Sequence, residues 1–188
     1  TITNSTFTGN TAGGLGGGVD NKRDGRMQIS GSTFTSNEAE YGGGAASQGS
    51  AIFAPGETTI TGSTFSSNAA TEYGGGFFNI LNTAEVINTD FTANTAVEGA
   101  GLSGINGGQV TVTGGTFFEN TAVKTGGGLH NELAVLNIDS VDIVHNHAGR
   151  HGGGVFNWAG TIHVTGSEFR ENSAGEAGGG IENTGDTI

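Results

Sequence analysis

The sequence repeats itself seven times with a nearly constant period. In each repeat an aromatic or aliphatic residue is followed three places later by asparagine, two further by alanine, and then by a glycine cluster and an apolar residue. The steps between repeats are 27, 31, 26, 26, 26 and 26 residues, a regularity typical of stacked structural units. The aromatic column contains Phe7, Phe34, Phe65, Phe91, Phe117, Ile143 and Phe169, and the asparagine column contains Asn10, Asn37, Asn68, Asn94, Asn120, Asn146 and Asn172.

The apolar residues within a repeat alternate with polar ones, as in Thr161-Ile162-His163-Val164, and this is the periodicity of strands. Three short strands fit into one repeat, around Val164, Phe169 and Ile181. The pattern predicts an all-β fold, a parallel β-helix of seven coils with about 26 residues per coil and three short strands per coil. We expect a right-handed helix because parallel crossover connections are almost always right-handed. Residues 1–188 form one predicted domain, expected to be a fragment of a longer repeat protein.

Two sets of residues predict the bends of each coil. Asparagine, glycine or serine stands three places before each aromatic-column residue, and these types are suited to turns. Glycine triplets such as Gly126-Gly127-Gly128 predict a second bend where backbones crowd. The asparagine column is expected to form an internal hydrogen-bonded ladder, and the phenylalanine column a stacked apolar core. Both columns are structural in this interpretation, and they require no cofactor.

Charge and cysteine content restrict the possible partners and the compartment. The chain has 38 Gly, no Cys and a formal net charge of −12, which argues against a nucleic-acid partner because nucleic acids require a basic surface. Its apolar runs are too short to span a bilayer. The absence of cysteine suits a chain that is exported unfolded, although it does not define the compartment by itself.

The Phe-x-x-Asn element occurs six times, for example as Phe117-Phe118-Glu119-Asn120, and each repeat adds a glycine cluster followed by an apolar residue. This combination resembles the repeats of the chlamydial polymorphic membrane proteins and similar bacterial surface β-helix proteins. Their glycine motif is Gly-Gly-Ala, whereas this chain usually has Gly-Gly-Gly, as in Gly126-Gly127-Gly128-Leu129. The resemblance implies an autotransporter-like passenger with adhesive function and an extracellular location, either secreted or on the bacterial cell surface.

Aromatic residues outside the core column are candidates for binding. Phe156 and Trp158, the only tryptophan, are expected on the outer face after the glycine bend, with His130 one coil below Phe156. These rings could stack on a sugar or on an apolar patch of a partner, unless a neighbouring loop covers them. The extra residues between the second and third coils contain Phe53 and Pro55, and they form either a binding loop or a segment folded back over the rod.

Histidines and carboxylates near the end of the chain are weaker candidates for metal binding. His145 and His147 are close in sequence, and Asp142 and Glu168 occupy one column on adjacent coils. The alternative is that the carboxylates form a solvated surface and the histidines pair with neighbouring polar side chains. Another lateral column, which includes Glu98, Lys124, Arg150 and Glu176, predicts ion pairs between adjacent coils.

These observations favour a structural or adhesive segment that presents a rigid rod for attachment or fibre formation. The expected partners are other copies or flanking coils joined end to end, and a host-surface protein or glycan. The alternative is a polysaccharide lyase, a hydrolase or a carbohydrate-binding module. The sequence feature that would favour an enzyme is a dense cluster of carboxylates and basic residues on adjacent coils, and the sequence does not show one.

Overall fold

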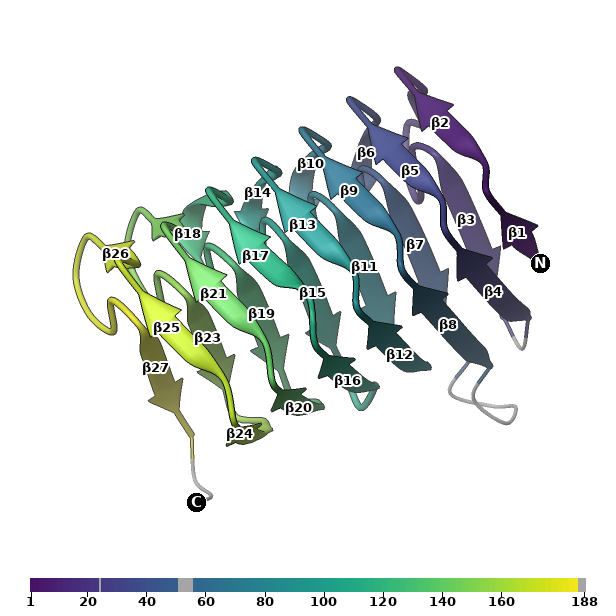
Figure 1. Cartoon of the computed structure of the whole chain (residues 1–188). Coiled ribbons are helices and arrows are strands. Elements are labelled where there is room, and N and C mark those ends of the chain that lie inside the picture. The colour runs from purple at the N-terminus through teal and green to yellow at the C-terminus, as the bar shows by residue number, and fades with distance from the viewer. Residues whose placement is uncertain (24, 51–55, 186–188) are drawn as a thin grey trace.

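The computed structural model describes residues 1–23, 25–50 and 56–185, and these form a parallel β-solenoid. Strands from successive coils stack in register along one rod (Figure 1), with the N- and C-terminal coils at opposite ends. Every pairing between the named strands is parallel. The expected seven coils and all-β architecture are confirmed.

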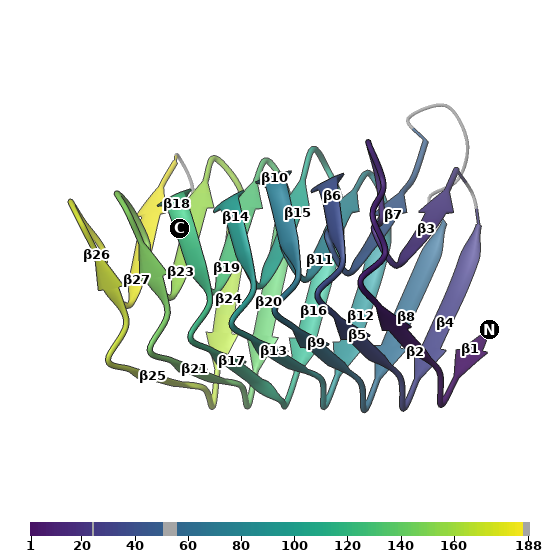
Figure 2. The same ribbon diagram turned by 90° about the horizontal axis from the view of Figure 1, so that it is seen from above.

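The strands form four sheets, so six of the seven coils contribute four short strands where three were expected, and the first coil contributes three. The coil passes from sheet A through sheets B and C to sheet D, and Figure 2 shows the same stacking from a direction 90° away. Sheet A contains β1 (Ile2–Thr3), β4 (Arg26–Ser30), β8 (Glu57–Thr61), β12 (Thr83–Ile87), β16 (Gln109–Thr113), β20 (Val135–Asp139) and β24 (Thr161–Thr165). Sheet B contains β2 (Thr6–Thr8), β5 (Thr33–Thr35), β9 (Thr64–Ser66), β13 (Asp90–Thr92), β17 (Thr116–Phe118), β21 (Asp142–Val144) and β25 (Glu168–Arg170).

The additional strand forms sheet C, which begins just after the asparagine column. Sheet C contains β6 (Glu38–Tyr41), β10 (Ala69–Tyr73), β14 (Thr95–Glu98), β18 (Thr121–Thr125), β22 (His147–Ala148) and β26 (Ser173–Ala174). The glycine bend then leads into sheet D, which contains β3 (Val19–Lys22), β7 (Ala45–Gln48), β11 (Phe77–Ile80), β15 (Leu102–Ile105), β19 (Leu129–Glu132), β23 (Val155–Trp158) and β27 (Ile181–Thr184).

The asparagine column forms the predicted ladder. The Nδ2 atom of each asparagine from Asn10 to Asn146 donates to Oδ1 of the next at 2.8–3.0 Å. The same Oδ1 also accepts from the backbone N–H of the preceding asparagine, and from Asn37 onward Nδ2 bonds a carbonyl of the aromatic column one coil back. Five members, from Asn37 to Asn146, are buried with these groups satisfied.

The aromatic column stacks inside the rod through the first five coils. Ring centroids from Phe7 to Phe117 are 4.5–5.0 Å apart and neighbouring planes differ by at most 10°. Ile143 takes the position in the sixth coil, and Phe169 packs partly buried against the same core. The aliphatic residues of sheet A share this core, as do the first residues of the sheet D strands, such as Leu102 and Leu129.

The glycine bends bring backbone and aromatic rings too close for a side chain. A Cβ atom on Gly76 would lie 2.5 Å from the Gly101 carbonyl oxygen and 2.7 Å from Cδ1 of Phe91. We expect Gly76→Ala to lower the free energy of unfolding by about 3 kcal/mol, measured by urea denaturation. Gly13→Ala is the control, because a Cβ there meets nothing within 4 Å, and it should change stability by no more than about 0.5 kcal/mol. Equal effects of the two substitutions would contradict this account of the bend.

Candidate functional site

A lateral groove runs along the outside of the rod, in the corner between the ends of the sheet C strands and the outer face of sheet D. It arises because the glycine bend turns the chain back on itself, so that side chains at the end of one strand approach those on the next. The sheet C side presents Tyr41, Tyr73, Glu98 and Thr125 in successive coils. The sheet D side presents two outward columns: Ala46, Phe78, Ser103, His130 and Phe156, then Gln48, Ile80, Ile105, Glu132 and Trp158.

The N-terminal half of the groove is an apolar pocket of about 330 Å³. Tyr41 and Tyr73 stack in parallel with ring centroids 6.1 Å apart, and both lie tilted against Phe78, at 5.3 and 6.1 Å. Ile80 and Ile105 complete its apolar wall. An apolar concavity with aromatic walls is typical of sites that bind small molecules or chain-like ligands.

The C-terminal half of the groove is an acidic pocket of about 320 Å³, lined by Tyr73, Glu98, Thr125, His130, Glu132, Phe156 and Trp158. The His130 ring lies edge-on to Tyr73 at 5.8 Å and tilted against Phe156 at 5.5 Å, so rings continue from the apolar pocket into this one. Burial first, and then the negative charges of Glu98 and Glu132, raise the pKa of Tyr73 to about 12. The two carboxylates in the lining of this pocket favour a cationic group there.

The expected binding residues on sheet D lie in the acidic pocket, although not as expected. Trp158 is 48 % exposed, whereas Phe156 and His130 are buried, at 9 % and 2 %. The expectation of an exposed Phe156 on a flat face is wrong, because the corner with sheet C surrounds that position. Phe53 and Pro55 lie outside the described residues.

The four metal candidates from the sequence do not form one cluster. Asp142 and Glu168 are neighbours in register on sheet B, whereas His147 lies on sheet C and hydrogen-bonds Oγ of Ser173 through Nδ1 at 2.9 Å. His145 pairs through Nε2 with Glu171 at 2.8 Å. Within the described part of the chain, the group of three His, Asp or Glu residues that could hold an ion is Glu98, His130 and Glu132.

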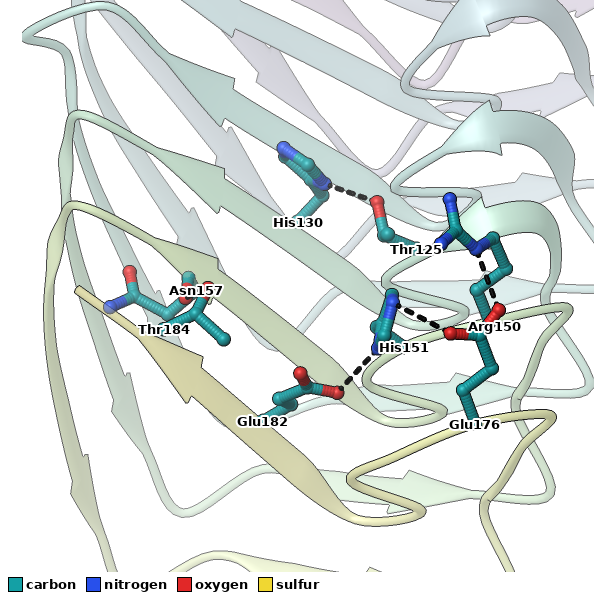
Figure 3. A network of polar contacts seen from close by, with 8 residues as sticks. All are labelled: Thr125, His130, Arg150, His151, Asn157, Glu176, Glu182 and Thr184. Carbon is teal, nitrogen blue, oxygen red and sulfur yellow. Dashed lines mark hydrogen bonds and ion pairs between the residues drawn. The ribbon is translucent and has the colours of Figure 1, made fainter.

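Both ion pairs predicted for the lateral charge column are present. Lys124 Nζ lies 3.7 Å from Glu98 Oε1, and Arg150 Nε lies 2.8 Å from Glu176 Oε1. Figure 3 shows Arg150 beside Glu176, with His151 between Glu176 and Glu182. The hydrogen bond and charge of Arg150 hold the pKa of the Glu176 carboxyl below its usual value.

Sequence reasoning did not identify Tyr41, Tyr73, Glu98, Thr125 or Glu132 as site residues. Their signal is weak, because the period places them outside the core but does not show which outer columns face each other across the glycine bend. Only the recurrence of tyrosine directly before the glycine triplets of the second and third coils, as Tyr41 and Tyr73, could have drawn attention to this corner.

The fold and the groove define a β-solenoid with a ligand-sized lateral site. No protein-family model, curated protein or solved structure matches the chain. Among the described residues, no helix is long and apolar enough to cross a membrane.

Proposed function

We propose that this chain is an adhesive segment of a secreted or cell-surface bacterial protein, and that the lateral groove binds an elongated glycan lying along the rod. The observation that supports this most is the set of accessible rings along the groove: Tyr41 and Tyr73 are partly exposed and stack on adjacent coils, and Trp158 is exposed at the C-terminal end. The C–H faces of sugar rings stack on aromatic side chains, and a row of rings can contact several sugars of one chain.

The polar groups of the groove favour a particular class of glycan. Carboxylates of Glu98 and Glu132 and the amide of Gln48 can accept hydrogen bonds from sugar hydroxyls. The net charge of −12 disfavours uronic acids and other acidic sugars, because like charges meet at the surface. The expected ligand is therefore a neutral or amino-bearing glycan.

Tyr73 lines both pockets, so its removal should weaken binding most. We expect Tyr73→Ala to reduce affinity for a neutral glycan identified on a glycan array by at least about tenfold, which corresponds to about 1.4 kcal/mol. Phe118→Ala is the matched control, because this half-buried aromatic residue lies on sheet B beside His145 and outside the groove. It should bind like the parent chain in calorimetric titrations. Equal affinities of Tyr73→Ala and Phe118→Ala would contradict the assignment of the groove.

Hydrolysis of the bound glycan is a second candidate function, favoured by one observation. Oxygens of Glu98 and Glu132 approach within 4.8 Å in the acidic pocket, on adjacent coils. Retaining glycosidases use two carboxyl groups about 5–5.5 Å apart. Release of new reducing ends from the bound glycan, abolished by Glu132→Gln, would favour this enzyme function, whereas binding without release would favour adhesion.

A further inference from the structure

Glu98, His130 and Glu132 converge from adjacent coils on one point of the acidic pocket. Glu98 ends β14, and His130 and Glu132 are alternate residues of β19, so both point outward from sheet D. One ligand atom from each residue lies within 4.8 Å of the others. His130 Nε2 is 3.5 Å from Glu132 Oε2, and His130 Nδ1 is 3.6 Å from Glu98 Oε2.

The His130 ring has one nitrogen without a hydrogen-bond partner among the described residues, Nε2, and this nitrogen lies on the side of Glu132. The side chain is 2 % exposed, and Nε2 has no hydrogen-bond partner in the described structure. Nδ1 is hydrogen-bonded to Oγ1 of Thr125 at 2.9 Å, as Figure 3 shows. When Nδ1–H donates to this hydroxyl, Nε2 presents its lone pair toward the Glu132 carboxylate, an arrangement that is unfavourable unless a cation lies between them.

We infer that Glu98, His130 and Glu132 form a binding site for a divalent transition-type cation, of which Zn²⁺ is the representative. Two ligands of a tetrahedral Zn²⁺ are roughly 3.4 Å apart when the bonds are about 2.0–2.1 Å, and the 3.5 Å between His130 Nε2 and Glu132 Oε2 fits this spacing. Thr125 acts as a positioning residue, because ligating histidines typically donate their other N–H to an oxygen.

The donor set selects the class of ion. One imidazole nitrogen with two carboxylates suits Zn²⁺ or Ni²⁺, whereas Ca²⁺ and Mg²⁺ prefer shells made only of oxygen. Lys124 is ion-paired with Oε1 of Glu98, which leaves Oε2 on the side of His130. Three protein ligands leave a coordination position open for water or for a group of a bound molecule. This site differs from the sequence-based expectation that no cofactor is needed.

The chain contains its own reporter of occupancy, since Trp158 is the only tryptophan and lines the same pocket. Titration of the chain with Ni²⁺, which quenches tryptophan emission at short range, should give saturable quenching. Isothermal titration calorimetry with Zn²⁺ alone, near neutral pH, should give one site per chain. Ca²⁺ should bind at least about tenfold more weakly than Zn²⁺.

Variants connect this binding to the three residues. We expect His130→Ala and Glu132→Gln each to weaken Zn²⁺ binding by at least about 10- to 100-fold. Losses of this size follow even when the substituted residue only hydrogen-bonds a metal ligand, and these two residues are ligands themselves. Because removal of the buried imidazole can destabilise the fold, the nearly isosteric Glu132→Gln provides the decisive comparison. His147→Ala is the matched control, since His147 is an exposed histidine on β22 bonded to Ser173. It should bind Zn²⁺ like the parent chain.

Three results would overturn the inference: no saturable Zn²⁺ binding, binding undiminished by Glu132→Gln, or Ca²⁺ binding as tight as Zn²⁺ binding. The inference does not depend on the proposed glycan function, because the titrations contain the metal ion alone. Glycan binding without metal binding would contradict only the cation site, and metal binding without glycan binding would contradict only the adhesive groove.

Discussion

Phe117→Ala should lower the free energy of unfolding by about 3–5 kcal/mol. Phe117 is fully buried, and its ring stacks on Phe91 with centroids 4.6 Å apart. Rigid coils on either side cannot collapse into the space, so the substitution leaves a cavity and interrupts the stack. Urea denaturation followed by circular dichroism measures the change.

The adjacent residue gives the control for this experiment. Phe118 belongs to the same strand, β17, but points to the outer face, where it is half-buried and contacts the edge of the His145 ring. Phe118→Ala should therefore cost no more than about 1 kcal/mol. Similar losses of stability for the two substitutions would contradict the assignment of Phe117 to the core and of Phe118 to the outer face.

Asn120→Ala should destabilise the chain by about 3 kcal/mol or more, although asparagine is polar and of modest size. The Oδ1 atom of Asn120 accepts from both the backbone N–H and Nδ2 of Asn94, and its Nδ2 donates to the Phe91 carbonyl and to Asn146. Alanine leaves several of these buried groups without partners, each at a cost of about 1–3 kcal/mol. The loss is measured from the midpoint of urea unfolding, and the dependence of the free energy of unfolding on urea concentration is compared between variants.

The ladder supplies its own control at the first coil. Asn10 is exposed and only donates to the next rung, through its backbone N–H and Nδ2. Asn10→Ala should cost less than about 1 kcal/mol, because water can satisfy the groups that it leaves. An Asn120→Ala variant as stable as Asn10→Ala would contradict the structural role of the buried rungs.

The columns that define the coil could be predicted from the sequence because one residue type recurs at each position. The bend before the aromatic column was predicted from Asn4, Gly31 and their equivalents, and all seven residues have φ between 45° and 63°. A third bend, in addition to this one and the glycine bend, was missed. It lies just before each asparagine, at Ser36, Ala93, Glu119 and their equivalents, where φ is 53–56° for all but Gly9. Nothing in alanine or glutamate favours that conformation.

The asparagine ladder supplies the physical reason for this bend. Each asparagine bonds the next through both its backbone N–H and its side chain, and this double attachment imposes the left-handed turn on whichever residue precedes it. Such a conformation costs on the order of 1–3 kcal/mol and persists only where surrounding contacts determine it. The turn separates sheet B from sheet C, which is why the additional strand could not be predicted from composition.

The candidate site was less predictable than the fold. The period placed Glu98 in phase with Lys124, and that ion pair is confirmed, but it could not place Glu98 beside His130. The register of sheet C shifts between Ala96 and Glu98, so that Glu98 pairs with Thr125 at the edge of the groove. Contacts across the glycine bend depend on such shifts, which a single sequence does not show.

All six side-chain hydrogen bonds between ladder asparagines point the same way, with the donor on the earlier coil and the acceptor on the later one. Their amide dipoles add along the rod instead of cancelling, and each bond polarises its neighbours in the dry interior. The ladder consequently has a net dipole along the axis of the solenoid. A coil grafted from another β-solenoid would extend this row of dipoles only if its asparagine pointed in the same direction and occupied the same position of the 26-residue repeat. One mismatched asparagine would divide the row into two shorter rows with weaker mutual polarisation.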